Sequence, residues 1–259
     1  MANQGDGTRE WAPRTVNLIR GCRHKCRYCY GCAMAVHYRG IDPQDWPNEV
    51  LVEKMARRTF RPCGDMVMYP SAHDITPEYL QQHIDFIAKL LRAYPKVLIV
   101  TKPHLECIRA ICDAFAGERD RILFRFTIGS TSDDVLGFWE PGAPRYSERM
   151  ACLELAYQRG FGTSVSCEPM LDDKVEDVVR AAQPYVTDTI WIGEANMLRH
   201  RASLNGYKDD ETAAKVDQLL AWQSDDNILA LYQRLKDNPQ IRWKRSIQRV
   251  VGLEAPIAA

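Results

Sequence analysis

The sequence predicts an α/β fold: a partial, open (β/α)6 barrel related to the TIM barrel, with a C-terminal helical extension. Two observations carry this prediction. Strand-like runs and helical patterns alternate six times over about 180 residues, which is typical of repeated βα units and a parallel sheet. Beyond residue 208 two helical patterns follow each other directly. Because a closed TIM barrel needs eight units, six units predict a barrel that stays open.

The expected strands are short apolar runs, of which residues 96–101 form the clearest buried one. In chain order they are residues 15–20, 66–69, 96–101, 122–128, 163–167 and 187–192.

The expected helices are marked by capping residues and by apolar side chains at helical spacing. Thr76 and Pro77 open one helix, and Gly160 ends another. In chain order the expected helices cover residues 33–38, 48–58, from 76 to beyond 91, 103–115, 147–160 and 173–182, then 211–222 and 225–237. Residues 129–144 are expected as a loop, and residues 241–247 as a basic strand or hairpin arm.

The predicted organisation has three parts: a polar N-terminal arm (1–14), a barrel domain (15–200), and an extension that packs on the barrel (201–259). Hydrophobic residues make up 46% and charged residues 26% of the chain, as in ordinary globular proteins. The first ten residues have no apolar core, and no run approaches the length of a membrane span. We therefore expect a cytoplasmic protein with no membrane partner.

Three cysteines directly follow the first expected strand at C-x3-C-x2-C spacing, as Cys22, Cys26 and Cys29. Thiolates are soft ligands that select zinc or iron–sulfur centres, and three of them leave one coordination position open. Zinc is the alternative, with Cys32 as a fourth ligand, but no second C-x2-C or H-x3-H pair follows. A disulfide is disfavoured by the expected intracellular location.

Polar residues follow each expected strand, where chemistry gathers in parallel βα folds. They are Ser71, His73, Asp74, Thr101, Lys102, Thr127, Ser130, Cys167, Glu168, Glu194 and Asn196. We expect one cavity at this edge of the sheet, above the cysteine loop. His24 and His37 are expected at the surface.

The cysteine motif, with the aromatic Tyr28 before its last cysteine, resembles that of radical S-adenosylmethionine (SAM) enzymes. Further stretches are similar to the group that contains spore photoproduct lyase, and the similarity covers roughly residues 15–200. They are residues 124–133, 140–144 with Arg149, Ser71-x-x-Asp74, Thr101-Lys102 and Glu168-Pro169.

The resemblance implies the partial-barrel fold, a [4Fe–4S] cluster on Cys22, Cys26 and Cys29, and SAM as second cofactor. It also implies reductive cleavage of SAM to a 5′-deoxyadenosyl radical, with an electron from a flavodoxin- or ferredoxin-like donor. Candidate SAM contacts are Tyr28, Ser71, Lys102, Ser130 and Glu168. Cys167 is either a hydrogen-atom donor, as a cysteine is in the lyase, or a buried core residue.

Three classes of function remain open: a radical SAM enzyme, an iron–sulfur electron-transfer or sensor protein without SAM cleavage, and a structural zinc protein. The substrate is expected to be a small molecule or an exposed nucleotide, because 34 basic and 34 acidic residues give no net charge that would favour duplex DNA. The tail Arg242–Arg245 with Arg249 fits either nucleic-acid contact or a solvated edge strand, and we favour the edge strand.

Overall fold

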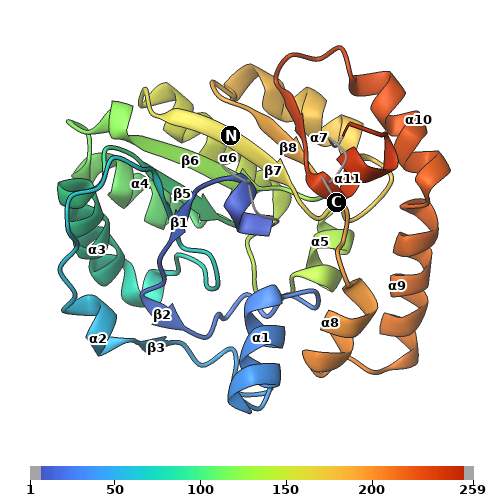
Figure 1. Cartoon of the computed structure of the whole chain (residues 1–259), viewed down its shortest axis with the longest axis horizontal. Coiled ribbons are helices and arrows are strands. Elements are labelled where there is room, and N and C mark those ends of the chain that lie inside the picture. The colour runs from blue at the N-terminus through green and yellow to red at the C-terminus, as the bar shows by residue number, and fades with distance from the viewer. Residues whose placement is uncertain (1–6, 254–259) are drawn as a thin grey trace, which may run out of the picture.

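The computed structural model describes residues 7–253, and its centre is a curled parallel sheet that forms a half-barrel (Figure 1). The sheet has seven strands in the order β1-β4-β5-β6-β7-β8-β9, and every neighbouring pair is parallel. The strands are β1 (Arg14–Thr15), β4 (Val67–Tyr69), β5 (Val97–Thr101), β6 (Ile122–Thr127), β7 (Gly162–Cys167), β8 (Ile190–Ile192) and β9 (Ile241–Trp243). The predicted partial barrel is confirmed.

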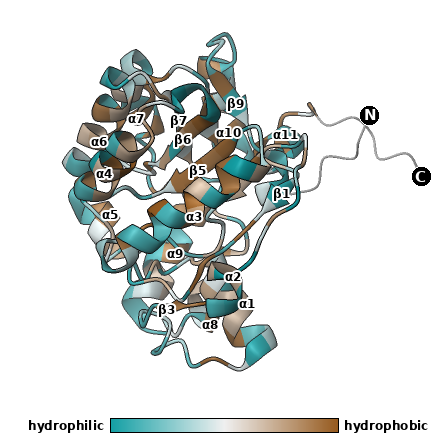
Figure 2. Ribbon diagram, turned by 90° about the vertical axis from the view of Figure 1, so that its left-hand side faces the viewer, coloured by the Kyte–Doolittle hydropathy of each residue, from teal (hydrophilic) through white to brown (hydrophobic). Residues whose placement is uncertain are grey.

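Helices cover the convex face of the sheet, with α3, α4, α6 and α7 along its length (Figure 2). The helices before β8 are α1 (Tyr30–Arg39), α2 (Glu53–Ala56), α3 (Leu80–Ala93), α4 (Leu105–Ala114), α5 (Asp133–Trp139), α6 (Tyr146–Gln158) and α7 (Val175–Ala182). The later ones are α8 (Leu198–Leu204), α9 (Asp210–Trp222), α10 (Asp225–Leu235) and α11 (Arg245–Val250). Short 3-10 helices lie at Gly7–Glu10 (η1), Pro77–Tyr79 (η2), Arg119–Arg121 (η3) and Gln183–Tyr185 (η4).

Alternation along the strands gives the sheet two faces that pack differently. Ile99, Phe124 and Phe126 belong to the main core under the helices and are fully buried. The intervening residues face the concave side, because successive strand side chains point to opposite faces. On β6 such a residue is Arg125, whose Nε donates to Ser164 Oγ at 2.9 Å. Met68, Leu98 and Leu123 lie on the same side and form a second, smaller apolar cluster, so the concave side combines apolar residues with the buried Arg125.

The first expected strand, residues 15–20, is wrong as a single strand. Only Arg14–Thr15 joins the sheet, and β2 (Ile19–Arg20) pairs with β3 (Val50–Leu51) in a separate antiparallel ribbon. The Asn17 carboxamide draws the chain away from the sheet, since its oxygen accepts from Ser71 N at 2.8 Å. Formation of β3 also shortens the helix expected at 48–58 to α2.

The expected loop at 129–144 contains α5, which the sequence does signal. Ser132 Oγ accepts from Val135 N, and Asp133 and Asp134 stand in the first turn. Helix α8 was not expected either. The two helices expected after residue 208 are present as α9 and α10.

The two ends of the described chain meet at the open side of the half-barrel. Strand β9 adds to the sheet beside β8, so the C-terminal segment contributes a strand as well as helices. Lys244 Nζ, just after β9, binds Glu10 Oε1 of η1 at 3.0 Å and donates to Gly7 O at 2.7 Å. Of the expected N-terminal arm, residues 1–6 lie outside the described residues, as do 254–259 at the other end.

Within residues 7–253, no helix combines the length and the apolar character that crossing a membrane requires.

Candidate active site

The cysteine loop joins β2 to α1 at the carboxyl-terminal edge of the sheet, where Cys22 and Cys26 are buried and Cys29 is half-buried. Cys29 is also the N-cap of α1, and its Sγ accepts from Cys32 N at 3.3 Å. Burial raises the pKa of all three thiols, and their mutual charge adds to this for Cys22 and Cys26. Each of the nine cysteines is a free thiol. Buried neutral thiols of this kind can lose their protons to a soft metal centre that binds them as thiolates.

The donor set fits an iron–sulfur cluster in chemistry and in charge. The Lys102 ammonium opposes the effect of burial on the Cys26 thiol, because its charge lowers the pKa and so stabilises the thiolate. It lowers the pKa of the Cys29 thiol in the same way. Thiolates on a cluster are anionic, so a neighbouring ammonium stabilises the loaded site. In the described part of the chain, no three His, Cys, Asp or Glu side chains converge on a single metal ion. A [4Fe–4S] cluster takes each thiolate on a different iron, so its ligands need not converge in that way.

The loop after α5 clamps the cysteine loop through the backbone. Arg27 N donates to Trp139 O at 2.8 Å, and Gly142 N donates to His24 O at 3.0 Å. A Cβ on Gly142 would lie 2.2 Å from Arg23 O, so this close approach requires glycine. The segment 139–142 thus fixes the backbone that carries the thiols.

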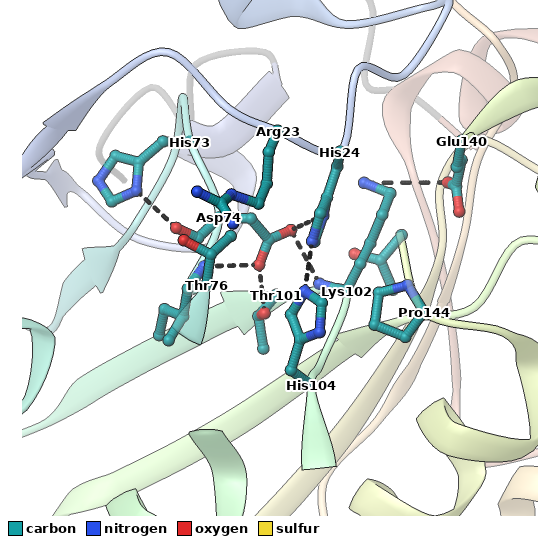
Figure 3. A network of polar contacts seen from close by, with 12 residues as sticks. Arg23, His24, His73, Asp74, Thr76, Thr101, Lys102, His104, Glu140 and Pro144 are labelled. Carbon is teal, nitrogen blue, oxygen red and sulfur yellow. Dashed lines mark hydrogen bonds and ion pairs between the residues drawn. The ribbon is translucent and has the colours of Figure 1, made fainter. Parts of the chain in front are cut away.

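His24 is fully buried inside the cysteine loop, so the expectation that it lies at the surface is wrong. Its Nδ1 lies 3.1 Å from Asp74 Oδ2, and its Nε2 lies 2.9 Å from His104 Nε2 (Figure 3). The loop turns inward here because Lys25 adopts the left-handed conformation, with φ of 51°. His37, in contrast, is exposed on α1 as expected.

Asp74 connects the cysteine loop to the ends of β4 and β5. It accepts hydrogen bonds from the Thr101 hydroxyl, from Lys102 N at 3.0 Å and from Ile75 N at 2.8 Å (Figure 3). Burial alone would raise the pKa of Asp74, but His24 and Lys102 outweigh it and lower that pKa. The carboxylate is therefore charged in the folded protein and holds three segments in register.

A second buried acid, Glu140, lies under Tyr28 and Lys102. Its carboxylate accepts from the Tyr28 hydroxyl, lies 3.9 Å from Lys102 Nζ and pairs with Arg149. The Lys102 ammonium also lies 5.6 Å from the centre of the Tyr28 ring. Burial would lower the pKa of Lys102, but Cys26 and Glu140 raise it, so the lysine remains an ammonium. Glu140 and Arg149 lie in stretches that resemble the lyase group, but the sequence predicted no role for either residue.

A cavity of about 740 Å³ opens beside the cysteine loop at this edge of the sheet. Three of the five predicted SAM contacts line it: Tyr28, Ser71 and Glu168. The other walls come from the segment after β8, from α8 and α11, and from η1; these lining residues are Gly7–Trp11, Tyr30, Pro169, Glu194–Met197, Arg201, Arg245, Ser246 and Arg249. The structure thus brings the ends of β4, β7 and β8 together around one space, as the rule for parallel βα folds predicts.

Ser71 and Glu168 are each held by one neighbour. Ser71 Oγ accepts from Asn17 Nδ2 at 2.9 Å, which leaves its own hydroxyl hydrogen able to donate. Glu168 Oε2 lies 3.3 Å from Lys244 Nζ. A Cβ on Gly193 would lie 2.8 Å from Lys244 Cγ, so glycine at this position gives the lysine room to reach Glu168.

Three predicted site residues are not part of the cavity lining: Lys102, which lies between Tyr28 and Glu140, Ser130 and Cys167. Ser130 is fully buried, donates its hydroxyl to Asp172 and accepts from Ser132 N at 2.9 Å, so it organises the start of α5. Cys167 belongs to the main core on the helix-covered side of the sheet, and burial raises its pKa to about 12. Its position gives no support to a hydrogen-donor role.

The chain is similar to known proteins in its structure but not detectably in its sequence. No protein-family model matches the chain, and no curated protein matches its sequence. A solved structure of a point mutant of spore photoproduct lyase is similar with a TM-score of 0.50 and 15% identity, over 81% of this chain and 66% of that one. A second point mutant of spore photoproduct lyase, solved with dinucleoside spore photoproduct, gives a TM-score of 0.52 and 14% identity, over 93% of this chain and 78% of that one. The fold of this chain is therefore similar to that of spore photoproduct lyase, which confirms the expected resemblance at the level of the fold.

Proposed function

We propose that this chain is a radical SAM enzyme whose cluster is held by Cys22, Cys26 and Cys29. The observation that carries the proposal is the place of the three thiols: one short loop at the carboxyl-terminal edge of a half-barrel, beside a cavity and next to the Lys102 ammonium. The fold shared with spore photoproduct lyase supports it.

A cluster held by Cys22, Cys26 and Cys29, with an electron from a flavodoxin- or ferredoxin-like partner, would supply reductive cleavage of SAM to methionine and a 5′-deoxyadenosyl radical able to abstract hydrogen. The side chains of the protein bind SAM and orient it. Tyr28 and Ser71 border the cavity beside the thiols and offer a ring face and a hydroxyl donor. Lys102 supplies a fixed positive charge, and Glu168 offers acceptor oxygens to ribose hydroxyls.

The test is anaerobic reconstitution of the full chain with iron and sulfide, followed by reduction with dithionite in the presence of SAM. We expect a brown protein that converts SAM into 5′-deoxyadenosine. A brown protein that leaves SAM intact would identify an iron–sulfur electron-transfer or sensor protein instead. A colourless protein that binds one zinc ion would identify a structural zinc site.

A further inference from the structure

A single lysine, Lys244, joins both ends of the described chain to the cavity. It follows β9, and its side chain is buried although it belongs to the basic tail of the sequence. Its Nζ lies 3.0 Å from Glu10 Oε1, donates to Gly7 O at 2.7 Å and lies 3.3 Å from Glu168 Oε2. An ammonium has three hydrogens, so these three acceptors match its donors. The contacts of the ammonium therefore fix its position.

The packing around Lys244 keeps the side chain in this place. Its ammonium lies 4.4 Å from the centre of the Trp11 ring and 5.8 Å from that of the Trp191 ring. Gly193 makes the approach to Glu168 possible, because a Cβ there would lie 2.8 Å from Lys244 Cγ and 3.1 Å from Glu168 Cγ. The lysine and the glutamate therefore meet because position 193 carries no side chain.

Glu168 is the partner of Lys244 that carries this arrangement to the proposed cofactor contacts. Its side chain is 17% exposed and lines the cavity. An ion pair at one oxygen still leaves lone pairs for ribose hydroxyls, since a carboxylate has about four acceptor positions. Burial raises the pKa of Glu168, and the Lys244 ammonium opposes that rise. The lysine thus orients the acid and favours its charged form, which is the stronger acceptor.

We propose that Lys244 is a positioning residue that holds Glu168 toward the ribose of the bound cofactor, and that the site thereby distinguishes a ribose from a deoxyribose. The inference rests on the proposed function, in which Glu168 accepts from ribose hydroxyls. A buried acceptor is left unpaired by an analogue that lacks the hydroxyl, and the affinity for that analogue falls. Through Lys244, η1 and the segment after β9 become parts of the cofactor site.

The test is equilibrium dialysis of the full chain, reconstituted with iron and sulfide, against labelled S-adenosylhomocysteine and its 2′,3′-dideoxy analogue. The first ligand presents the nucleoside of SAM and is bound without cleavage, and the second lacks both ribose hydroxyls. The original chain should bind the dideoxy analogue about tenfold more weakly, because a hydrogen bond to a charged acceptor is lost. In Lys244→Met, and equally in Glu168→Gln, the two affinities should lie within about threefold of each other.

Two further variants separate positioning from folding. Gly193→Ala keeps both charges but displaces the Lys244 side chain, so it should also reduce the discrimination. Arg125→Met is the matched control, because the Arg125 guanidinium is buried near the same two indole rings, 5.1 and 5.3 Å from their centres, but pairs with Asp188. Arg125→Met should keep the discrimination of the original chain. Urea unfolding of each variant checks that it is folded, and Gly193→Ala and Glu168→Gln decide the question if Lys244→Met is not.

Equal discrimination in the original chain and Lys244→Met, or an equal loss in Lys244→Met and Arg125→Met, would overturn the inference. An original chain that binds both ligands equally, or neither of them, would overturn it as well. The dialysis requires no cleavage, so its result is independent of the SAM assay. Discrimination that depends on Lys244 without 5′-deoxyadenosine formation would leave the positioning role standing and remove the proposed function. Cleavage of SAM with discrimination that does not depend on Lys244 would do the reverse.

Discussion

Arg149 Nη2 lies 2.5 Å from Glu140 Oε2, and neither side chain has any exposed surface. The arginine is fixed further by hydrogen bonds from Nε to Pro144 O at 2.8 Å and from Nη1 to Thr127 O at 3.1 Å. Through Glu140 the pair reaches the Tyr28 hydroxyl and the Lys102 ammonium. This ion pair therefore connects α6 and the end of β6 to the cysteine loop.

Removal of one partner of that pair should destabilise the protein strongly. Glu140→Gln leaves the Arg149 charge buried and uncompensated, which costs about 3–5 kcal/mol in comparable sites. The free energy of unfolding from urea titration measures this loss. The matched control is Glu176→Gln, whose partner Arg234 lies in a partly exposed pair at 3.0 Å, and it should cost at most about 1 kcal/mol. Equal losses in the two variants would contradict a structural role for the buried pair.

The three loop cysteines should be individually required for the cluster, and a fourth nearby cysteine should not. Cys22→Ala, Cys26→Ala and Cys29→Ala should each abolish iron and sulfide incorporation, because each removes one ligand. Cys32 packs with Trp46 in a small apolar cluster, and burial raises its pKa to about 12. Cys32→Ala should therefore retain the brown colour. Loss of the cluster in Cys32→Ala would show that four cysteines bind it and that no iron is open.

SAM affinity should depend on Ser71 and Lys102 while the cluster remains. Lys102→Ala removes a charge-assisted contact, worth about 1.5–3 kcal/mol or roughly a 10- to 150-fold weakening. Ser71→Ala removes a neutral donor and should weaken binding by roughly 0.5–1.5 kcal/mol. Equilibrium dialysis with labelled SAM on reconstituted protein measures both. Lys174→Ala, an exposed lysine before α7, is the control. Unchanged affinity in both variants would separate β4 and β5 from the SAM site.

Most of the half-barrel could be predicted because its signals are local. Runs such as residues 96–101 and caps such as Gly160 act within a few residues, so the observed strands and helices follow the pattern closely. The failures depend on distant partners. Residues 15–20 do not form one strand because Asn17 and His73 accept hydrogen bonds from backbone N–H groups more than 50 positions away in the sequence. The hydrophobic periodicity of a segment does not predict such long-range hydrogen bonds.

The same distinction explains the site. The spacing of the cysteines can be read from one short stretch of sequence. The burial of His24 cannot, because it depends on Asp74 and His104 at the ends of two other strands. Glu140 and Arg149 had a sequence signal in the quoted segment, but their pairing through the core is a tertiary fact. For Lys244 the sequence is misleading, because a lysine in a basic tail is expected to be exposed to solvent. The side chain is only 1% exposed and lies between two carboxylates.

Duplex DNA should bind weakly or not at all at physiological salt. The chain has as many acidic as basic residues, 34 of each, and four arginines line the cavity, fewer than a face that contacts many phosphates of a duplex would need. A salt series with labelled duplex checks this, since each phosphate contact contributes a slope of about 0.9 log units. A slope that reports six or more contacts would contradict the expectation. Charge reversal at exposed Arg242 should leave whatever binding is measured nearly unchanged.

Stability should fall on the acid side because His73 is buried in its neutral form. Its Nε2 accepts from Leu18 N at 3.0 Å and from Ile19 N at 3.2 Å, while Nδ1 lies 2.8 Å from Asp74 O. Burial lowers the pKa of His73 to about 4, from an ordinary value of about 6.5. Between these two values the unfolded chain binds a proton that the folded protein does not. Stability is therefore complete above pH 6.5 and is lost as the pH falls toward 4, by about 3 kcal/mol from this group.

The variant His73→Gln isolates this contribution, because a carboxamide oxygen can accept the same backbone hydrogen bonds without titrating. Urea unfolding between pH 7.5 and pH 4 should give a shallower loss for His73→Gln than for the original chain. A residual slope should remain, since burial also lowers the pKa of the neighbouring His83 to about 3. His37→Gln, at an exposed position on α1, should reproduce the original slope. If His73→Gln and His37→Gln gave the same pH profile, His73 would take up its proton as readily in the folded protein as in the unfolded chain, which would contradict its role as acceptor for Leu18 N and Ile19 N.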